Sequence, residues 1–193
     1  MSALPLTTSQ TVGPFFSPSL LREDARRNVL VRPETVGERI RIEGRVLDGD
    51  GAPVTDALVE VWQANAHGRY QHPTDHEPAP TTDDAFLGFG RSATDEDGWY
   101  WFETIKPGRV PFDDVLMAPH IVVTVFARGL LNHAVTRLYF ADDPSTTTDP
   151  VLQCVPFDRR QTLLAQPSRI DGHTAYRFDI ILQGTGETAF FNL

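Results

Sequence analysis

The histidines are the residues of this chain whose type and spacing bear most directly on metal chemistry. His120 begins a run of apolar, mostly β-branched residues, while His72, His76 and Glu77 lie close together in a polar segment. A metal site needs several convergent ligands with a supporting shell. Two interpretations therefore stay open: a site assembled from His120 and the loop residues, or a histidine kept on a buried strand for packing and hydrogen bonding. The isolation of His120 favours packing.

The remaining histidines, the cysteine and the net charge indicate no further reactive site. His67, His133 and His173 lie in expected turns or loops without mutual ligand spacing, so we expect surface or local hydrogen-bonding roles for them. The single cysteine, Cys154, has no partner for an intrachain disulfide. A net charge of -9, without a cluster of Lys and Arg, argues against nucleic acid as a partner.

The beginning of the chain does not resemble a targeting signal. Residues 1–10 have neither a cationic start nor an apolar run of signal-peptide length, and no stretch approaches the ~18 apolar residues of a membrane span. We therefore expect a cytoplasmic protein with no membrane association.

Two runs with the period of β-strands flank a turn near the start of the chain. In Arg39 to Leu47, isoleucine and valine alternate with charged residues, as in a half-buried strand, and Ala57 to Gln63 is similar. The Asp-Gly-Asp-Gly-Ala-Pro segment between them supplies turn residues. This pattern predicts a pair of neighbouring strands in an antiparallel β-sandwich.

Further strands and short helices follow along the chain. A second hairpin is expected around the Asp-Glu-Asp-Gly turn at 95–98, and the most buried strand is expected from Pro119 to Arg128, at the centre of a sheet. The loop from Gln71 to Gly90 is long enough to be functional or disordered. The remaining expected elements are strands at Arg91–Thr94, Trp99–Ile105, Thr136–Phe140 and Thr174–Leu182, and helices at Ser19–Arg27 and, capped by Asp158, at Arg159–Ala165.

These elements predict one mainly β domain over residues 1–193, with short helices and an extended N-terminal arm at 1–16. The length suits a single core, and no linker or internal repeat divides it. Pro5, Gly13 and Pro14 argue against regular structure in the arm. The arm must then be held by contacts with other parts of a protein.

Several strings in the chain resemble the intradiol ring-cleaving dioxygenases. The segment VEVWQANAHGRY is similar to the Val-Glu-Val-Trp-Gln-Ala and Gly-x-Tyr elements of that family. Further similar strings, from Ser9 to Phe191, are most like the alpha subunits of its protocatechuate-cleaving members: SQTVGPF, GFGRSATDEDGWYWFETIKPG, APHIVVTVFARGLL, TRLYFADD and GETAFF. The resemblance implies the family's mixed, mostly antiparallel β-sandwich.

The resemblance also implies that this chain has lost its own metal. Catalytic members hold ferric iron with two tyrosines and a His-x-His pair, ligands that suit hard Fe(III). His120 matches the first histidine, but Val122 matches the second, and Val110 and Glu77 match the two tyrosines. Three of four ligands are absent, so we expect no metal and no catalytic residue in this chain.

The function implied by the resemblance belongs to a heteromeric enzyme. A beta subunit would carry Fe(III), and this chain would close one face of its substrate pocket, with the arm contacting that partner. The residues that match pocket-lining positions are Thr11, Gly13, Pro14 and Arg128. Glycine permits close approach of the backbone to a ligand, and the Arg128 guanidinium can pair with the carboxylate of the substrate. Arg137 is the second choice for that pairing.

The implied reaction is cleavage of protocatechuate, 3,4-dihydroxybenzoate, by O2 to 3-carboxy-cis,cis-muconate. The implied assembly is a hetero-oligomer of alpha-beta protomers.

Two other functions stay open on sequence alone. One is a self-sufficient intradiol dioxygenase with an altered metal site, and the other is a non-enzymatic β-sandwich binding module. Iron content of the isolated chain separates the first from an iron-free subunit. The long series of family-like strings, more than a generic sandwich needs, counts against the second.

Overall fold

The computed structural model describes residues 19–20, 22, 27–71 and 86–192. The expected arm, most of the helix expected after Ser19 and most of the loop expected from Gln71 to Gly90 therefore lie outside the described residues. None of the helices formed by the described residues has the length and apolar character that crossing a membrane requires.

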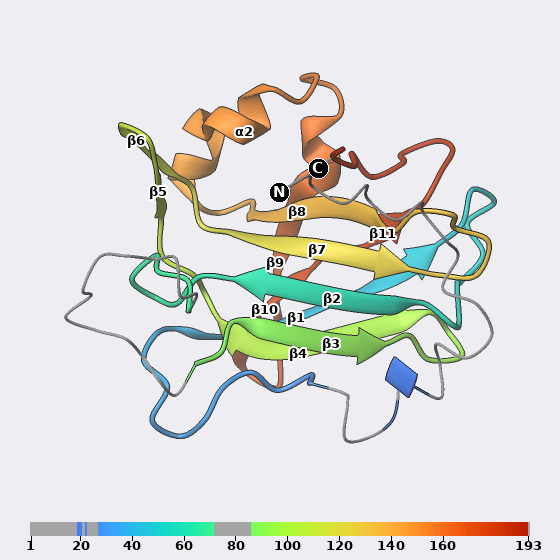
Figure 1. Cartoon of the computed structure of the whole chain (residues 1–193), viewed down its shortest axis with the longest axis horizontal. Coiled ribbons are helices and arrows are strands. Elements are labelled where there is room, and N and C mark those ends of the chain that lie inside the picture. The colour runs from blue at the N-terminus through green and yellow to red at the C-terminus, as the bar shows by residue number, and fades with distance from the viewer. Residues whose placement is uncertain (1–18, 21, 23–26, 72–85, 193) are drawn as a thin grey trace, which may run out of the picture.

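Two facing layers of strands form the molecule (Figure 1). One layer contains β3, β2, β7 and β8 in that order, and the other contains β4, β1, β10 and β9; β9 also pairs with β8 and so joins the two. The strands are β1 Arg39–Leu47, β2 Leu58–Gln63, β3 Phe89–Ala93, β4 Trp99–Ile105, β5 Val110–Phe112, β6 Val115–Met117, β7 His120–Phe126, β8 Ala134–Phe140, β9 Leu164–Ile170, β10 His173–Arg177 and β11 Ile180–Ile181.

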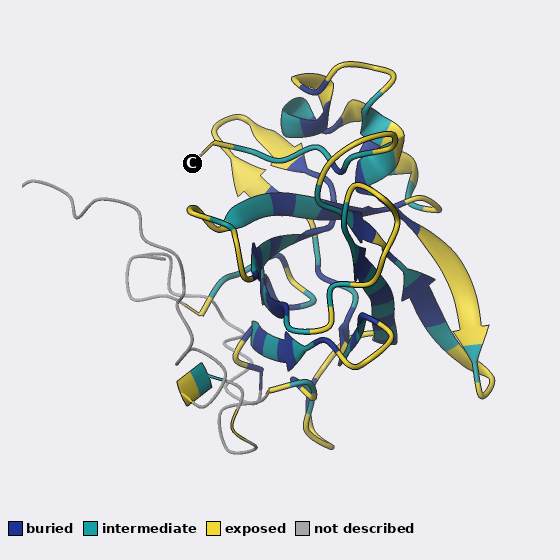
Figure 2. Cartoon of the chain, turned by 90° about the vertical axis from the view of Figure 1, so that its right-hand side faces the viewer, coloured by how far each residue is buried: buried dark blue, intermediate teal, exposed yellow. Residues whose placement is uncertain are grey.

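The core lies between the two layers, as the alternation in the sequence predicts. Along β1, Ile40, Ile42 and Val46 are buried and the charged residues between them are more exposed. Figure 2 shows buried and intermediate residues along most of the strands, while a few strand ends and many loops and turns are exposed. The predicted mainly β sandwich is confirmed. Most pairings are antiparallel, and β1 also pairs in parallel with β10 and β11.

The two predicted hairpins are wrong in their pairing. β1 pairs with β4, β10 and β11, whereas β2 pairs with β3 and β7, so the turn at 48–53 carries the chain from one layer to the other. The turn at 95–98 likewise joins β3 in one layer to β4 in the other. Both flanking strands bury one face against the same core, and this alternation is the same whether the strands pair by hydrogen bonds or face each other across the core.

A short segment fills the space between β3 and β4. Arg27 bridges to Arg91 of β3, and Val29 bridges to Glu103 of β4. The Asn28 amide donates 2.8 Å hydrogen bonds to the Ser92 hydroxyl and to the Trp101 carbonyl. The two layers are therefore tied together along this side as well as through β9, which gives the molecule the character of a nearly closed barrel.

The predicted strand from Thr174 to Leu182 is divided in two. The Phe178 amide donates to the Glu43 carbonyl, and the Phe178 carbonyl accepts a 2.6 Å hydrogen bond from the Tyr100 hydroxyl. A Cβ atom on Gly44 would lie 1.7 Å from that carbonyl oxygen. Glycine at position 44 thus allows β10 and β11 to meet β1 on either side of Phe178.

The region after β8 contains three short helices, η1 Pro144–Thr148, α2 Pro150–Gln153 and η2 Arg160–Leu163. The helix predicted from Arg159 to Ala165 is wrong in type and length, because the chain becomes extended at Leu164, where β9 pairs with β8. Asp158 does not cap it, since its N-cap residue is Arg159. β9 was not predicted because Gln166 to Arg169 are exposed and lack the apolar alternation of a half-buried strand.

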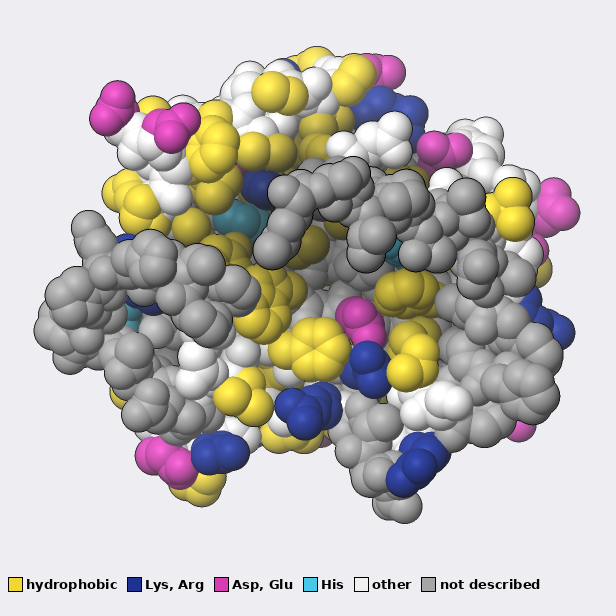
Figure 3. Space-filling view, viewed as in Figure 1, with side chains coloured by type: hydrophobic (Ala, Val, Ile, Leu, Met, Phe, Trp, Pro, Cys, Tyr) yellow, Lys and Arg dark blue, Asp and Glu magenta, His cyan; other side chains and the backbone are white. Residues whose placement is uncertain are grey.

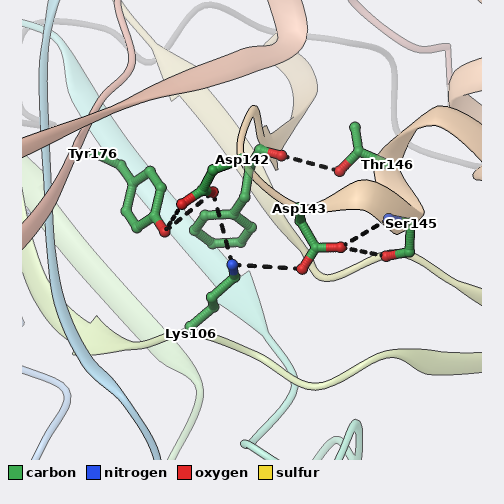
Figure 4. A network of polar contacts seen from close by, with 7 residues as sticks. Lys106, Asp142, Asp143, Ser145, Thr146 and Tyr176 are labelled. Atoms are coloured by element: carbon green, nitrogen blue, oxygen red, sulfur yellow. Dashed lines mark hydrogen bonds and ion pairs between the residues drawn. The ribbon is translucent and has the colours of Figure 1, made fainter.

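A polar network joins the layers beyond the end of β4 (Figure 4). The Lys106 ammonium lies 3.4 Å from an Asp143 carboxylate oxygen and 3.8 Å from one of Asp142. Asp142 accepts from the Tyr176 hydroxyl at 3.0 Å, and Asp143 accepts from the backbone and hydroxyl of Ser145. Lys106 also lies over the Phe140 ring, so one cation connects β4, β8 and β10.

Candidate functional site

The outer face of the first layer brings together the residues expected to concern the metal. Trp62 of β2, Val122 of β7 and Arg137 of β8 are directly paired in register, and so are His120 and Tyr139. Directly paired residues share one face of a sheet. Val122, which matches the second histidine of catalytic members, therefore lies between Trp62 and Arg137.

His120 is buried and satisfied by its own neighbourhood. Its Nδ1 lies 2.8 Å from the Ala118 carbonyl oxygen, which can only accept, so Nδ1 carries the proton and donates. Its Nε2 is then the acceptor and lies 3.5 Å from the Tyr70 hydroxyl. Burial lowers the pKa of His120, helped by the nearby Arg137 cation. His120 is therefore mainly a neutral imidazole at pH 7, the state that both packing and metal ligation require.

Tyr70 and Trp62 form an aromatic wall beside His120. The two rings stack with centroids 5.9 Å apart and an interplanar angle of 11°. Burial raises the pKa of Tyr70, although the Arg137 cation opposes the rise. Tyr70 is thus a neutral phenol at pH 7, and its hydroxyl lies beside Nε2 of His120, the residue that matches a ligand position.

Arg137 brings a positive charge to the same face. Its Nη1 lies 3.5 Å from the thioether sulfur of Met117. The charge acts on the titration of Tyr70, His120 and Tyr139, so the guanidinium lies close to all three. Within the described residues, no carboxylate lies within ion-pair distance of Arg137.

The buried carboxylate of Asp149 connects β8, the start of α2 and the residues just before β7 by hydrogen bonds. Its carboxylate accepts from the Ala118 amide at 2.8 Å, from the Tyr139 hydroxyl at 2.9 Å, and from the Val151 and Leu152 amides at the start of α2. Burial and the Asp149 charge raise the pKa of Tyr139 well above its ordinary range. Sequence analysis missed this residue, although an aspartate directly before a proline is a recognisable helix N-cap signal.

The described residues do not fit a ferric ion. Val110 and Met117 pack with Ala64 in a small apolar cluster, and Val122 offers only methyl groups. No group of three or more His, Cys, Asp or Glu side chains that could hold a metal occurs among the described residues. A guanidinium directly across from Val122 would further repel a cation. His72, His76 and Glu77, the loop residues of the alternative site, lie outside the described residues.

The residues expected to line the partner's pocket are only partly described. Arg128 lies just beyond the end of β7, at the opposite end of that strand from His120. Its side chain is 77% exposed and forms an ion pair with Asp56. Thr11, Gly13 and Pro14 lie outside the described residues, so their role beside Arg128 stays a prediction.

Comparison with known proteins places the chain in one family. A family model described as dioxygenase matches residues 11–184. The protocatechuate 3,4-dioxygenase alpha chain of Pseudomonas putida is 44% identical over 201 residues, with 98% of this chain and 97% of that one covered. The protocatechuate 3,4-dioxygenase beta chain of Burkholderia cepacia is 41% identical over 191 residues, covering 95% of this chain and 78% of that one.

A solved structure agrees with these relatives in fold. The dioxygenase domain of a dioxygenase and carbohydrate-binding fusion protein from Streptomyces sp. SirexAA-E superposes with a TM-score of 0.63 at 28% identity, covering 95% of this chain and 99% of that one. The predicted resemblance is confirmed over nearly the whole chain. The chain therefore belongs to the intradiol dioxygenase family.

Proposed function

We propose that this chain is the iron-free alpha subunit of a protocatechuate 3,4-dioxygenase. One observation carries the proposal: Val122 stands opposite Arg137 at the place where catalytic relatives are expected to bind iron, in a chain that matches an alpha chain from end to end. The proposed partner is a beta subunit that holds Fe(III), binds protocatechuate and O2 and opens the ring to 3-carboxy-cis,cis-muconate.

In this proposal the chain contributes to catalysis by positioning the substrate. Arg128 would pair with the protocatechuate carboxylate, and Thr11, Gly13 and Pro14 of the arm would close the partner's pocket. The Arg128 side chain is free to serve in this way, because it is largely exposed and its bond to Asp56 is a surface ion pair of the kind that contributes little to stability. Orientation and exclusion of water are effective forms of catalytic assistance.

An exposed apolar ribbon supports the existence of a partner. The β5 and β6 strands pair only with each other and stand clear of the two layers (Figure 1). Phe112, Val115 and Leu116 on this ribbon are about half exposed, and Figure 3 shows hydrophobic side chains gathered at that corner of the molecule. Apolar groups grouped on a surface are typical of protein interfaces.

The experiment compares the chain produced alone with the chain co-produced with a beta-chain relative encoded in the same genome. Iron content and protocatechuate-dependent oxygen uptake are measured for both preparations. We expect iron and activity only in the co-purified complex. Iron and turnover in the chain alone would overturn the proposal in favour of a self-sufficient enzyme, and failure to form any complex would favour a binding module. Cytoplasmic location also stays a prediction.

A further inference from the structure

The layer formed by β4, β1, β10 and β9 carries a group of charged side chains at one end of its outer face. Glu103 of β4 pairs directly with Arg41 of β1, and His173 of β10 pairs directly with Ile170 of β9. Because β1 pairs in parallel with β10 and alternate residues share a face, Arg39 lies on the same face as these four. Side chains from four neighbouring strands therefore meet on the opposite side of the core from the candidate site described above.

A cavity of about 270 Å³ opens among these side chains. One wall is Val31, in the segment before β1, and another is the turn between β9 and β10, which contributes Ile170 and Asp171. Pockets for drug-sized ligands measure roughly 300 to 1,000 Å³. This cavity therefore suits a smaller molecule, and Val31 and Ile170 give it an apolar part.

The two carboxylates of the cavity have few partners in the described part of the chain. The Glu103 side chain is 48% exposed, and its one ion pair there is a long contact of 3.7 Å with Nη1 of Arg41. Asp171 is exposed in the turn, and its carboxylate has no hydrogen bond or ion pair with another described residue. Both carboxylates are thus available to a cationic donor.

The cavity also holds a cation that has no carboxylate partner among the described residues. Nη2 of Arg39 donates to the backbone carbonyls of Arg32 and Pro33, which are neutral acceptors. Arg41 differs, because its Nε already lies 3.1 Å from a carboxylate oxygen of Glu43. Arg39 is therefore the guanidinium that can pair with a carboxylate from outside the chain.

We propose that this cavity binds a free α-amino acid with an apolar side chain. A ligand with one charge would be attracted by one group of the cavity and repelled by another, whereas a zwitterion meets both signs. The ligand carboxylate pairs with Arg39, its ammonium group pairs with Glu103 and Asp171, and its hydrocarbon side chain packs against Val31 and Ile170. The site does not rest on the proposed subunit function.

The test is calorimetric titration of the full chain with L-leucine, which carries both charges and an apolar side chain. L-leucine methyl ester lacks the negative charge and N-acetyl-L-leucine lacks the positive charge, so each removes one half of the recognition. We expect saturable leucine binding and at least about tenfold weaker binding of either derivative. Glycine lacks the side chain and should also bind about tenfold more weakly.

Two variants assign the charges to residues. Arg39→Gln and Glu103→Gln each remove an exposed charge from the cavity, and each should weaken leucine binding about tenfold. The matched variants Arg109→Gln and Glu96→Gln remove exposed charges that do not line the cavity, and they should bind leucine as the unmodified chain does. Circular dichroism should show the same fold in all four variants.

The contrary outcomes are distinct. Binding of either derivative as tightly as leucine would overturn recognition of a zwitterion, and equally tight binding of glycine would overturn the apolar contact. Unchanged leucine affinity in both Arg39→Gln and Glu103→Gln would place the ligand elsewhere on the chain. Absence of saturable leucine binding would overturn the proposal as a whole, and it would leave the proposed subunit function unaffected.

Discussion

At the scale of single residues, the site differs from a metal centre in charge and in polarity. The Arg137 guanidinium carries a single positive charge, whereas a ferric ion carries three. Val110 and Val122 have only hydrocarbon side chains, which offer no oxygen or nitrogen ligand to a metal. His120 donates its Nδ1 proton to the Ala118 carbonyl, a contact that needs no metal. The residue that matched the family motif thus has a structural task.

The buried carboxylate of Asp149 should be among the most sensitive positions in the chain. Asp149→Ala removes the acceptor for Ala118, Tyr139 and two amides of α2, and buried donors left without partners are costly. We expect a loss of about 3 kcal/mol or more in the free energy of unfolding, measured by urea denaturation. Asp158→Ala, at an exposed aspartate nearby, should change the value by less than about 0.5 kcal/mol; equal effects would contradict the assignment.

Arg128 carries the prediction for substrate positioning. In the complex with the beta subunit, Arg128→Ala should raise KM for protocatechuate about tenfold with little change in kcat, because a uniform binding contact to the carboxylate is lost. Steady-state oxygen uptake measures both constants. Arg169→Ala, which removes an exposed arginine on β9, should leave both constants unchanged, and an unchanged KM in Arg128→Ala would remove this residue from the pocket.

At the scale of elements, alternation in the sequence located most strands well but not their partners. β1 has the predicted bounds, and β7 lies at a central position between β2 and β8 as expected. Pairing was wrong at both predicted hairpins because a turn sequence shows that the chain reverses, not whether the strands then share a sheet. β9 was missed because its stability comes from pairing with β8 and β10, which leaves no apolar pattern.

The candidate site was predictable to a similar degree. The motif comparison matches Val110 and Val122 to ligand positions. The structure places Val122 two residues after His120 on β7 and pairs Val110 with Met117, three residues before His120. The neighbourhood of the aromatic wall and the Arg137 charge depends on register across β2, β7 and β8. Register joins residues far apart in the chain, and no local pattern encodes it.

Substitution of Gly44 tests how closely β1 must approach the Phe178 backbone where it meets β10 and β11. Gly44→Ala would place a Cβ atom 1.7 Å from the Phe178 carbonyl oxygen, which the Tyr100 hydroxyl also holds in place. Backbone must therefore shift, and we expect a loss of more than about 3 kcal/mol in the free energy of unfolding. Gly51→Ala, where a Cβ atom meets nothing within 4 Å but φ is +80°, should cost only about 1 kcal/mol. A mild effect at Gly44 would show that β1 can move away from Phe178.

At the scale of the whole molecule, the Lys106 network links the two layers and should make stability depend on pH. Burial tends to raise the pKa of Asp143, but hydrogen bonds from Ser145 and the Lys106 cation outweigh it and hold the pKa below its ordinary value. A carboxyl group with a lowered folded-state pKa stabilises the fold above its unfolded pKa, and this contribution disappears as pH falls through the folded pKa.

Asp143→Asn is the variant that isolates this effect. At pH 6 we expect it to lower the free energy of unfolding by roughly 1 to 2 kcal/mol, and the difference from the unmodified chain should shrink below about pH 4. Urea denaturation at a series of pH values measures it, with Asp158→Asn as the exposed control. A difference that stays constant down to pH 3 would show that the charge of Asp143 is not responsible.

The order of the strands along the chain also affects how the protein folds during its synthesis. The layer that contains β4, β1, β10 and β9 is built from strands near both ends of the described chain. Arg41 of β1 pairs with Ala175 of β10, so one edge of β1 has no partner until nearly the whole chain has left the ribosome. Non-local pairing of this kind slows folding and exposes strand edges to aggregation. The nascent chain is therefore most vulnerable late in its synthesis, and fragments ending before β10 should not fold.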